Sequence, residues 1–98
     1  MEPTHYLYLA LPPRPSFVMD VSPAEYETLG RHFAYMDKLQ AEGKLMLTGP
    51  TLDGAYGIAI FKVTDAAEAQ ALAQNDPAVI EGLFRPNIHP VKLGAITP

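Results

Sequence analysis

The chain has 98 residues, of which 48% are hydrophobic and 18% are charged, and its 7 basic and 11 acidic residues give a formal net charge of −4. This length suits one domain over residues 1–98, and the composition is typical of a folded globular protein. The acidic balance gives no general attraction to nucleic acid, and the absence of cysteine excludes disulfides, thiolate nucleophiles and cysteine-ligated metal sites.

The distribution of apolar residues gives no sign of a membrane partner. No apolar run approaches the roughly 18 residues of a membrane-spanning helix, and residues 1–3 lack the basic and apolar regions of a secretory signal. We therefore expect a cytoplasmic protein.

The chain opens with a strand over residues 4–11, in which Tyr6, Tyr8 and Ala10 face one side and three leucines face the other. The prolines that follow cannot extend a central strand, because proline donates no ladder hydrogen bond. Residues 12–21 are therefore expected to form a loop, which is a candidate lid or partner contact.

A long helix is expected next, from Ser22 to Glu42. Its start carries the pattern of a capping box, Ser22-Pro23-Ala24-Glu25, and Gly43 supplies the left-handed residue that ends it. The 3-4 spacing of apolar residues predicts one buried stripe: Tyr26, Leu29, Phe33, Met36, and Leu39 or Gln40.

Two strands follow this helix. The first covers residues 45–48 and ends at Gly49-Pro50, and the second covers residues 56–63 after a turn at Asp53-Gly54. In the second strand, Gly57, Ala59, Phe61 and Val63 share one face.

A second helix is expected from Asp65 to Asn75, opened by a second capping box that ends at Glu68. Its buried face is small: Ala66, Ala69, Leu72 and Ala73. Asp76-Pro77 breaks the helix, residues 78–83 form a further turn, and residues 87–93 form the last strand. Pro90 places that strand at a sheet edge or at a bulge.

The element order β-α-β-β-α-β predicts an α+β, ferredoxin-like fold, with a four-stranded antiparallel sheet and two helices on one face. Two strands, 4–11 and 56–63, are apolar on both sides. The face without helices would be a large exposed apolar patch. We therefore predict a homodimer packed sheet to sheet, which encloses a barrel-like interior; the alternative is an exposed face of mild hydrophobicity.

Histidine is the residue type that carries the candidate chemistry. His5 is expected at the surface and His89 in a structural role, and their spacing to His32 predicts no metal site. No glycine-rich nucleotide motif is present, so no cofactor is predicted. His32 shares a helix face with Met36, and a buried imidazole must be paired or must line a cavity. It is either a hydrogen-bonded core residue or a general acid or base.

Asp76 also has two interpretations. It can cap the short helix that begins at Pro77, or its carboxylate can orient His32 and stabilise the cationic imidazole. Turn chemistry explains Asp53, while Arg31 and Arg85 are expected at the surface unless they bind an anionic group.

Several short features follow one another at characteristic separations: His32, Gly43, Gly49-Pro50, Gly57 and Asn75-Asp76-Pro77. Over about residues 4–95 this ordered set resembles the YciI-like (YCII-related) domain family. The resemblance implies a ferredoxin-like fold, a dimeric α+β barrel and a cleft that holds a histidine–aspartate pair, here His32 and Asp76. Some members of the family resemble lyases that remove chloride from chlorinated hydroxyquinols.

The sequence departs from the family pattern at one corner. Many relatives carry an arginine three residues before the histidine, where this chain has Leu29, with Arg31 nearby. An anion-binding role is therefore not implied there. The candidate substrate-binding residues around the pair are Tyr8, Met36, Gly49, Pro50, Tyr56 and Pro77.

Three functions remain open from the sequence. The first is a small dimeric enzyme of the lyase or isomerase type, in which His32 moves a proton of a small, aromatic molecule and Asp76 orients it. The second is a non-catalytic domain that binds a small molecule in the same cavity. The third is an interaction module in which the sheet face serves assembly alone.

Overall fold

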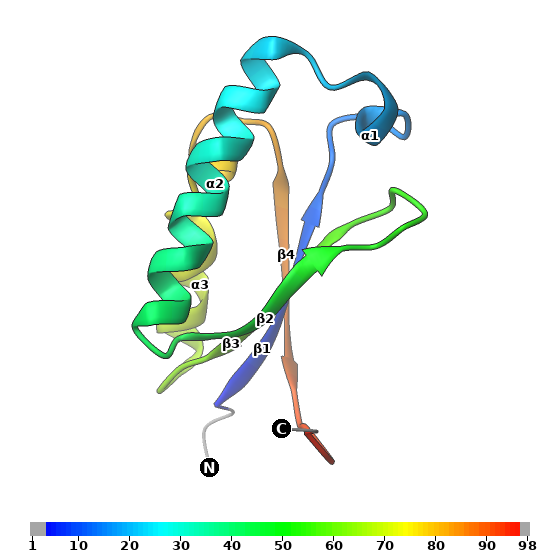
Figure 1. Ribbon diagram of the computed structural model, residues 1–98. Coiled ribbons are helices and arrows are strands. Elements are labelled where there is room, and N and C mark those ends of the chain that lie inside the picture. The colour runs from blue at the N-terminus through cyan, green and yellow to red at the C-terminus, as the bar shows by residue number, and fades with distance from the viewer. Residues whose placement is uncertain (1–3, 97–98) are drawn as a thin grey trace.

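The computed structural model describes residues 4–96, and its four strands form one antiparallel sheet in the order β2-β3-β1-β4. The strands are β1 (His5–Leu11), β2 (Leu45–Pro50), β3 (Gly57–Lys62) and β4 (Arg85–Val91). The helices are α1 (Phe17–Asp20), α2 (Pro23–Ala41), α3 (Ala66–Gln74) and α4 (Pro77–Ile80). Figure 1 shows α2 and α3 on the same side of the sheet. The predicted α+β, ferredoxin-like fold is confirmed.

The central strands bury one face and leave the other partly exposed. Tyr6, Tyr8 and Ala10 of β1 are buried beneath the helices, as are Ala59 and Phe61 of β3. The leucines that alternate with them in β1 are only partly buried. The alternation read from residues 4–11 therefore identifies the core face correctly.

The ends of α2 follow the local signals in the sequence. Ser22 accepts a hydrogen bond from the Glu25 backbone N–H, and the Glu25 carboxylate accepts one from the Ser22 N–H. Gly43 adopts a φ of 75° directly after the helix, a conformation that glycine reaches without a steric penalty. Although α2 has 19 residues, no helix within residues 4–96 is both long and apolar enough to cross a membrane.

The predicted buried stripe of α2 is wrong at two positions. Tyr26 and Phe33 are 64% and 59% exposed, whereas the polar residues Thr28 and His32 are buried together with Met36 and Leu39. Thr28 can be buried because its hydroxyl donates to the Glu81 carboxylate at 2.8 Å. Partners from distant parts of the chain, rather than hydropathy alone, select the buried face of this helix.

The capping box predicted for α3 forms only in part. Asp65 accepts a hydrogen bond from the Glu68 N–H, but the Glu68 carboxylate accepts from the backbone N–H and the hydroxyl of Thr64 instead of from Asp65. Ala66 is exposed, in contrast to the prediction, while the buried residues of the helix are Ala69, Leu72 and Ala73. Three of the four residues predicted to be buried are therefore confirmed, and only the first-turn residue Ala66 is not.

Three element boundaries differ from those expected. The segment over residues 12–21 contains α1 and is not a loop throughout. The second strand continues beyond residue 48 to Pro50, which pairs with Gly57 at the strand end. The last strand lies two residues earlier than predicted, at Arg85–Val91. As predicted from Pro90, it is an edge strand, where the missing N–H of a proline can be tolerated because one side of the strand has no partner strand.

The sheet face opposite the helices carries apolar side chains from β1 and β3. Leu7 pairs with Ile60 and Leu9 with Ile58 across these strands, and all four side chains are only partly buried. Residues after β4 lie along part of this face and form a groove with it, lined by Met46, Leu47, Ile60, Leu93, Ala95 and Ile96. This face remains the surface on which the predicted homodimer depends.

We expect Phe61→Ala to lower the free energy of unfolding by about 3–5 kcal/mol, because it leaves a cavity at the centre of the sheet. Urea denaturation followed by circular dichroism measures this loss. Leu52→Ala is the control, because Leu52 is fully exposed and its truncation should change stability by less than about 0.5 kcal/mol. Equal losses in the two variants would show that Phe61 is not a core residue.

Candidate functional site

A pocket of about 470 Å³ lies between α2, the sheet and the segment before α2. Its wall combines aromatic, aliphatic and glycine residues from β1, α1, α2, β2 and β3. Among the described residues that line it, none is an aspartate, glutamate, lysine or arginine. The pocket therefore suits an uncharged, largely apolar ligand.

Tyr26 and Phe33, which the sequence assigned to the core, belong to the pocket wall. Their exposure is therefore explained: they face a cavity between elements and not the packed interior. A helix stripe that lines a pocket has the same 3-4 spacing as one that fills a core, so the pattern alone did not separate the two.

His32 and Asp76 meet inside this site. The Nδ1 atom of His32 lies 2.9 Å from Oδ1 and 2.8 Å from Oδ2 of Asp76. The Asp76 side chain is fully buried and that of His32 is 11% exposed. Because an ionised carboxylate only accepts hydrogen bonds, the imidazole donates from Nδ1.

The other ring nitrogen of His32 faces the pocket. No hydrogen bond within residues 4–96 involves Nε2, and no buried side-chain nitrogen or oxygen in this range lacks a partner. Nε2 must therefore be accessible, and His32 is part of the pocket wall. With its proton on Nδ1, the neutral ring presents the lone pair of Nε2 to the cavity.

The two interpretations of Asp76 turn out to be compatible. Its Oδ1 accepts a hydrogen bond from the Ala78 backbone N–H at 2.9 Å and so caps α4, which begins at Pro77. The same carboxylate binds His32 and also accepts from the Tyr8 hydroxyl at 2.8 Å. The hydrogen bond that caps α4 thus also holds in place the carboxylate to which the imidazole is bonded.

Phe84 completes the surroundings of the imidazole. Its ring stands at 86° to that of His32, with the centroids 5.4 Å apart, and it also packs edge-on against Phe17 of α1. Neither Phe17 nor Phe84 was predicted as a site residue, because neither lies in a recognisable motif. Both phenylalanines line the pocket together with His32.

The other candidate residues divide into two groups. Tyr8, Met36, Gly49, Pro50 and Tyr56 line the pocket. Pro77 is not among the lining residues, since it occupies the first position of α4 behind the Asp76 cap.

Arg31, which precedes His32 in the sequence, does not line the pocket. Arg31 donates to both carboxylate oxygens of Glu81, at 2.7 and 2.6 Å. Leu29, three residues before His32, lines the pocket instead. At this position the pocket wall is therefore aliphatic, whereas an arginine in place of Leu29 could bind an anion.

The remaining polar candidates lie elsewhere. Asp53 accepts from the Thr51 hydroxyl and the Ala55 N–H, as expected for a turn. His89 is exposed and pairs with Leu7 across the strands, on the sheet face away from α2. Within residues 4–96, no group of three or more histidine, aspartate or glutamate side chains could hold a metal ion.

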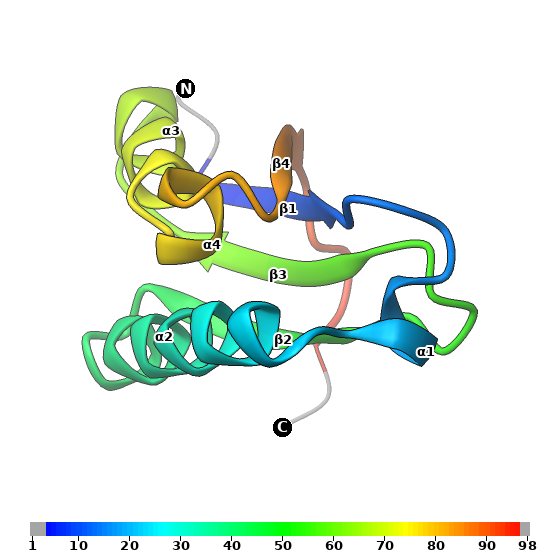
Figure 2. The same ribbon diagram turned by 90° about the horizontal axis from the view of Figure 1, so that it is seen from above.

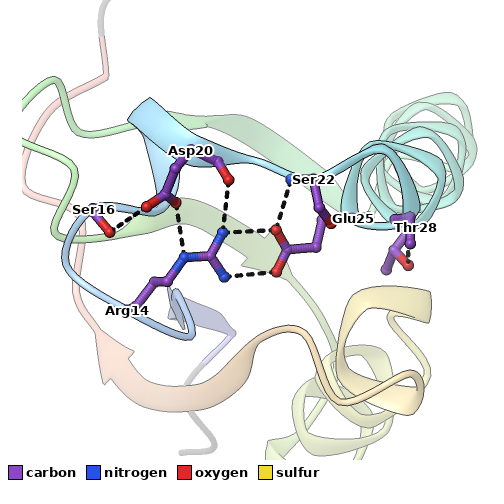
Figure 3. A network of polar contacts seen from close by, with 7 residues as sticks. Arg14, Ser16, Asp20, Ser22, Glu25 and Thr28 are labelled. Atoms are coloured by element: carbon purple, nitrogen blue, oxygen red, sulfur yellow. Dashed lines mark hydrogen bonds and ion pairs between the residues drawn. The ribbon is translucent and has the colours of Figure 1, made fainter.

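Residues 12–21 form a strap over one end of the pocket, and Arg14 holds it in place. Figure 3 shows the Arg14 guanidinium between Asp20 of α1 and Glu25 of α2. It donates to one carboxylate oxygen of Asp20 and to both carboxylate oxygens of Glu25, each at 2.8 Å, and also to the backbone carbonyl of Asp20 at 3.0 Å. The strap contributes Phe17 and Val18 to the pocket wall.

The strap also meets the turn between β2 and β3. Figures 1 and 2 place α1 beside this turn. A Cβ atom on Gly54 would lie 3.3 Å from Cγ2 of Val18. Since Gly54 also has a φ of 78°, a larger residue there would be strained and would press on the strap.

Comparisons with known proteins agree with this fold. The model of the YCII-related domain matches residues 6–91. The uncharacterized protein YjpA of Bacillus subtilis is 30% identical over 77 residues, which are 79% of this chain and 84% of that protein. A solved structure of 5-chloro-2-hydroxyhydroquinone dehydrochlorinase from Burkholderia phenoliruptrix, in complex with 2,5-dihydroxybenzoquinone, has a TM-score of 0.70 at 24% identity, covering 92% of this chain and 95% of that one.

The strap should give the protein a salt-sensitive loss of stability in acid. The hydrogen bonds from Arg14 lower the pKa of Glu25 from 4.5 to about 2. A carboxylate whose pKa is lowered by folding contributes stability above pH 4.5, and that contribution is lost as the pH falls towards 2. We therefore expect the melting temperature to fall over this range, and less steeply in high salt.

Arg14→Gln should flatten part of this dependence, because it removes the main cause of the lowered Glu25 pKa. Melting curves between pH 5 and 2 measure the effect. Arg85→Gln removes the same charge from an exposed position on β4 and should leave the slope as in the wild type. Parallel curves for all three proteins would contradict the assignment.

Proposed function

The chain belongs to the YCII-related domain family, and from this premise we propose that it is an enzyme of the lyase or isomerase type. Its substrate is a small aromatic compound without a fixed charge, which binds in the pocket beside His32. The observation that carries this proposal is the environment of His32. Its Nδ1 is bonded to the buried Asp76, and its Nε2 faces an apolar cavity.

In the proposed reaction, Nε2 of His32 accepts a proton from a hydroxyl or an acidic C–H of the substrate. The electron pair left behind moves into the ring of the substrate. The proton then returns to a ring carbon, which completes the reaction in an isomerase. In a lyase this carbon is the one that bears the leaving group. Transfer of a second hydroxyl proton of the substrate to Nε2 then expels the leaving group together with the electron pair of its bond to the ring. The imidazolium lies 2.8 Å from the Asp76 carboxylate, which stabilises its positive charge. Return of the proton to product or water restores the neutral ring.

The pocket supports an aromatic substrate by its shape and its lining. A volume of about 470 Å³ lies within the usual range for small-molecule sites, and aromatic side chains from several elements line it. The similar dehydrochlorinase acts on a hydroxylated, chlorinated ring. Because that similarity concerns the fold, it supports such compounds as first test substrates and does not assign one.

A second candidate function is ligand binding without turnover. The observation in its favour is that His32 is the one residue in the described pocket wall whose side chain ordinarily titrates near neutral pH. Among the described residues of this wall, no carboxylic acid, lysine or second histidine is placed to assist a leaving group. A protein that binds 2,5-dihydroxybenzoquinone but converts no hydroxylated aromatic compound would fit this alternative.

His32→Gln should lower kcat/KM by roughly 10²–10⁴-fold, because glutamine fills much of the same space but cannot accept the proton. The assay follows 5-chloro-2-hydroxyhydroquinone and a panel of hydroxylated aromatic compounds by absorbance. His5→Gln is the control, since His5 lies outside the pocket and contacts Thr4. Turnover at the wild-type rate in His32→Gln would remove His32 from the mechanism.

We also propose that a second copy of the chain covers the open sheet face. The partly exposed apolar residues of β1 and β3 on this face support it, because monomers rarely leave a large apolar patch in water. Leu9→Lys should then shift the sedimentation coefficient from that of a dimer to that of a monomer. Leu52→Lys, at a fully exposed position of the turn between β2 and β3, should leave it unchanged. A wild-type monomer at high protein concentration would overturn this proposal.

A further inference from the structure

The hydroxyl of Tyr8 is bonded to Asp76 and is not free to bind a ligand. Tyr8 lies in the middle of β1, and its ring is buried against Phe61 with the centroids 5.4 Å apart. Its hydroxyl donates to Oδ2 of Asp76 at 2.8 Å. Burial, together with the nearby Asp76 carboxylate, raises the pKa of Tyr8 well above its ordinary value, so the phenol stays protonated and remains a donor.

The Asp76 carboxylate is held at both of its oxygens. Oδ1 accepts the backbone N–H of Ala78, and Oδ2 accepts the hydroxyl of Tyr8. Nδ1 of His32 lies between the two, at 2.9 and 2.8 Å. The torsion that rotates a carboxylate group is broad, so contacts at both oxygens are needed to fix its plane.

These two contacts come from different parts of the fold. Ala78 belongs to α4 and moves with Asp76, because both lie in the same helical turn. Tyr8 belongs to the central strand β1, 68 residues away in the sequence. Tyr8 is therefore the contact that fixes the carboxylate relative to the sheet that forms the pocket wall.

We propose that Tyr8 is a positioning residue for the His32–Asp76 pair. Its hydroxyl fixes the carboxylate plane, so that His32 keeps its proton on Nδ1 and presents the lone pair of Nε2 to the pocket. The consequence for turnover rests on the proposed function, whereas the consequence for the imidazole proton does not. A ligand would meet only the ring of Tyr8.

The position of the imidazole proton is measured directly by ¹⁵N NMR of the histidine side chains, at about pH 8, where an ordinary imidazole is neutral. We expect the wild type to show His32 with its proton on Nδ1. In Tyr8→Phe, the ratio of the Nδ1–H to the Nε2–H form should fall by about tenfold, because the carboxylate is then free to rotate away from Nδ1, which weakens the hydrogen bond that favours the Nδ1–H form. Asp76→Asn serves as the reference for the largest change in this ratio, since its amide can donate to Nδ1 and so favours the Nε2–H form.

Tyr6→Phe is the matched control. Tyr6 is buried on the same strand and the same face, two residues before Tyr8, and its hydroxyl makes no contact with Asp76 among the described hydrogen bonds. This variant should keep the wild-type NMR signature. Replacement of Tyr8 by 3-fluorotyrosine keeps both ring and hydroxyl, and should keep the signature as well.

Turnover of the same substrates provides the second measurement. Tyr8→Phe should lower kcat by roughly 10–100-fold with little change in KM, and Tyr6→Phe should lower neither. An unchanged His32 signature in Tyr8→Phe, with a clear change in Asp76→Asn, would overturn the positioning role whatever the activity. A shifted signature together with full activity in His32→Gln would retain the positioning role and refute the proposed function.

Discussion

The site depends on a carboxylate that has no contact with water. Asp76 is fully buried, and an isolated buried carboxylate is too costly to keep ionised. Within residues 4–96, no lysine or arginine forms an ion pair with it. Its charge is stabilised instead by three donors, one each from a helix turn, a central strand and α2. The Asp76 carboxylate therefore links α4, β1 and α2 to one another.

The apolar pocket is the counterpart of this buried charge. Its wall shields the imidazole from bulk water, so that a positive charge on the ring would interact strongly with the carboxylate. The strap over residues 12–21 closes the same cavity, and Glu25 contributes to both the strap and the start of α2. The Glu25 carboxylate thus links the N-terminal cap of α2 to the strap that forms part of the pocket wall. Electrostatic and packing requirements therefore meet at two points of α2, at its start through Glu25 and at its middle through His32.

Local signals in the sequence were reliable where the interaction itself is local. The α2 capping box joins Ser22 to Glu25, and Gly43 needs only its own backbone freedom. The buried face of α2 was less predictable, because Thr28 and His32 are buried by partners more than 40 residues away in the chain. The strap could not be predicted either. Arg14 finds Glu25 only after the intervening segment has folded back.

The sequence by itself determined the order of the four strands and the two longer helices, the ends of α2 and the core face of the central strands. These follow from hydrogen bonds and side-chain periodicities that span only a few residues. It also identified His32 and Asp76 as candidates, but left the role of each open. Only the tertiary structure brought Asp76 to His32 and to Tyr8, which are 44 and 68 residues away. Such contacts depend on how helices and strands cross, and no local pattern encodes that crossing.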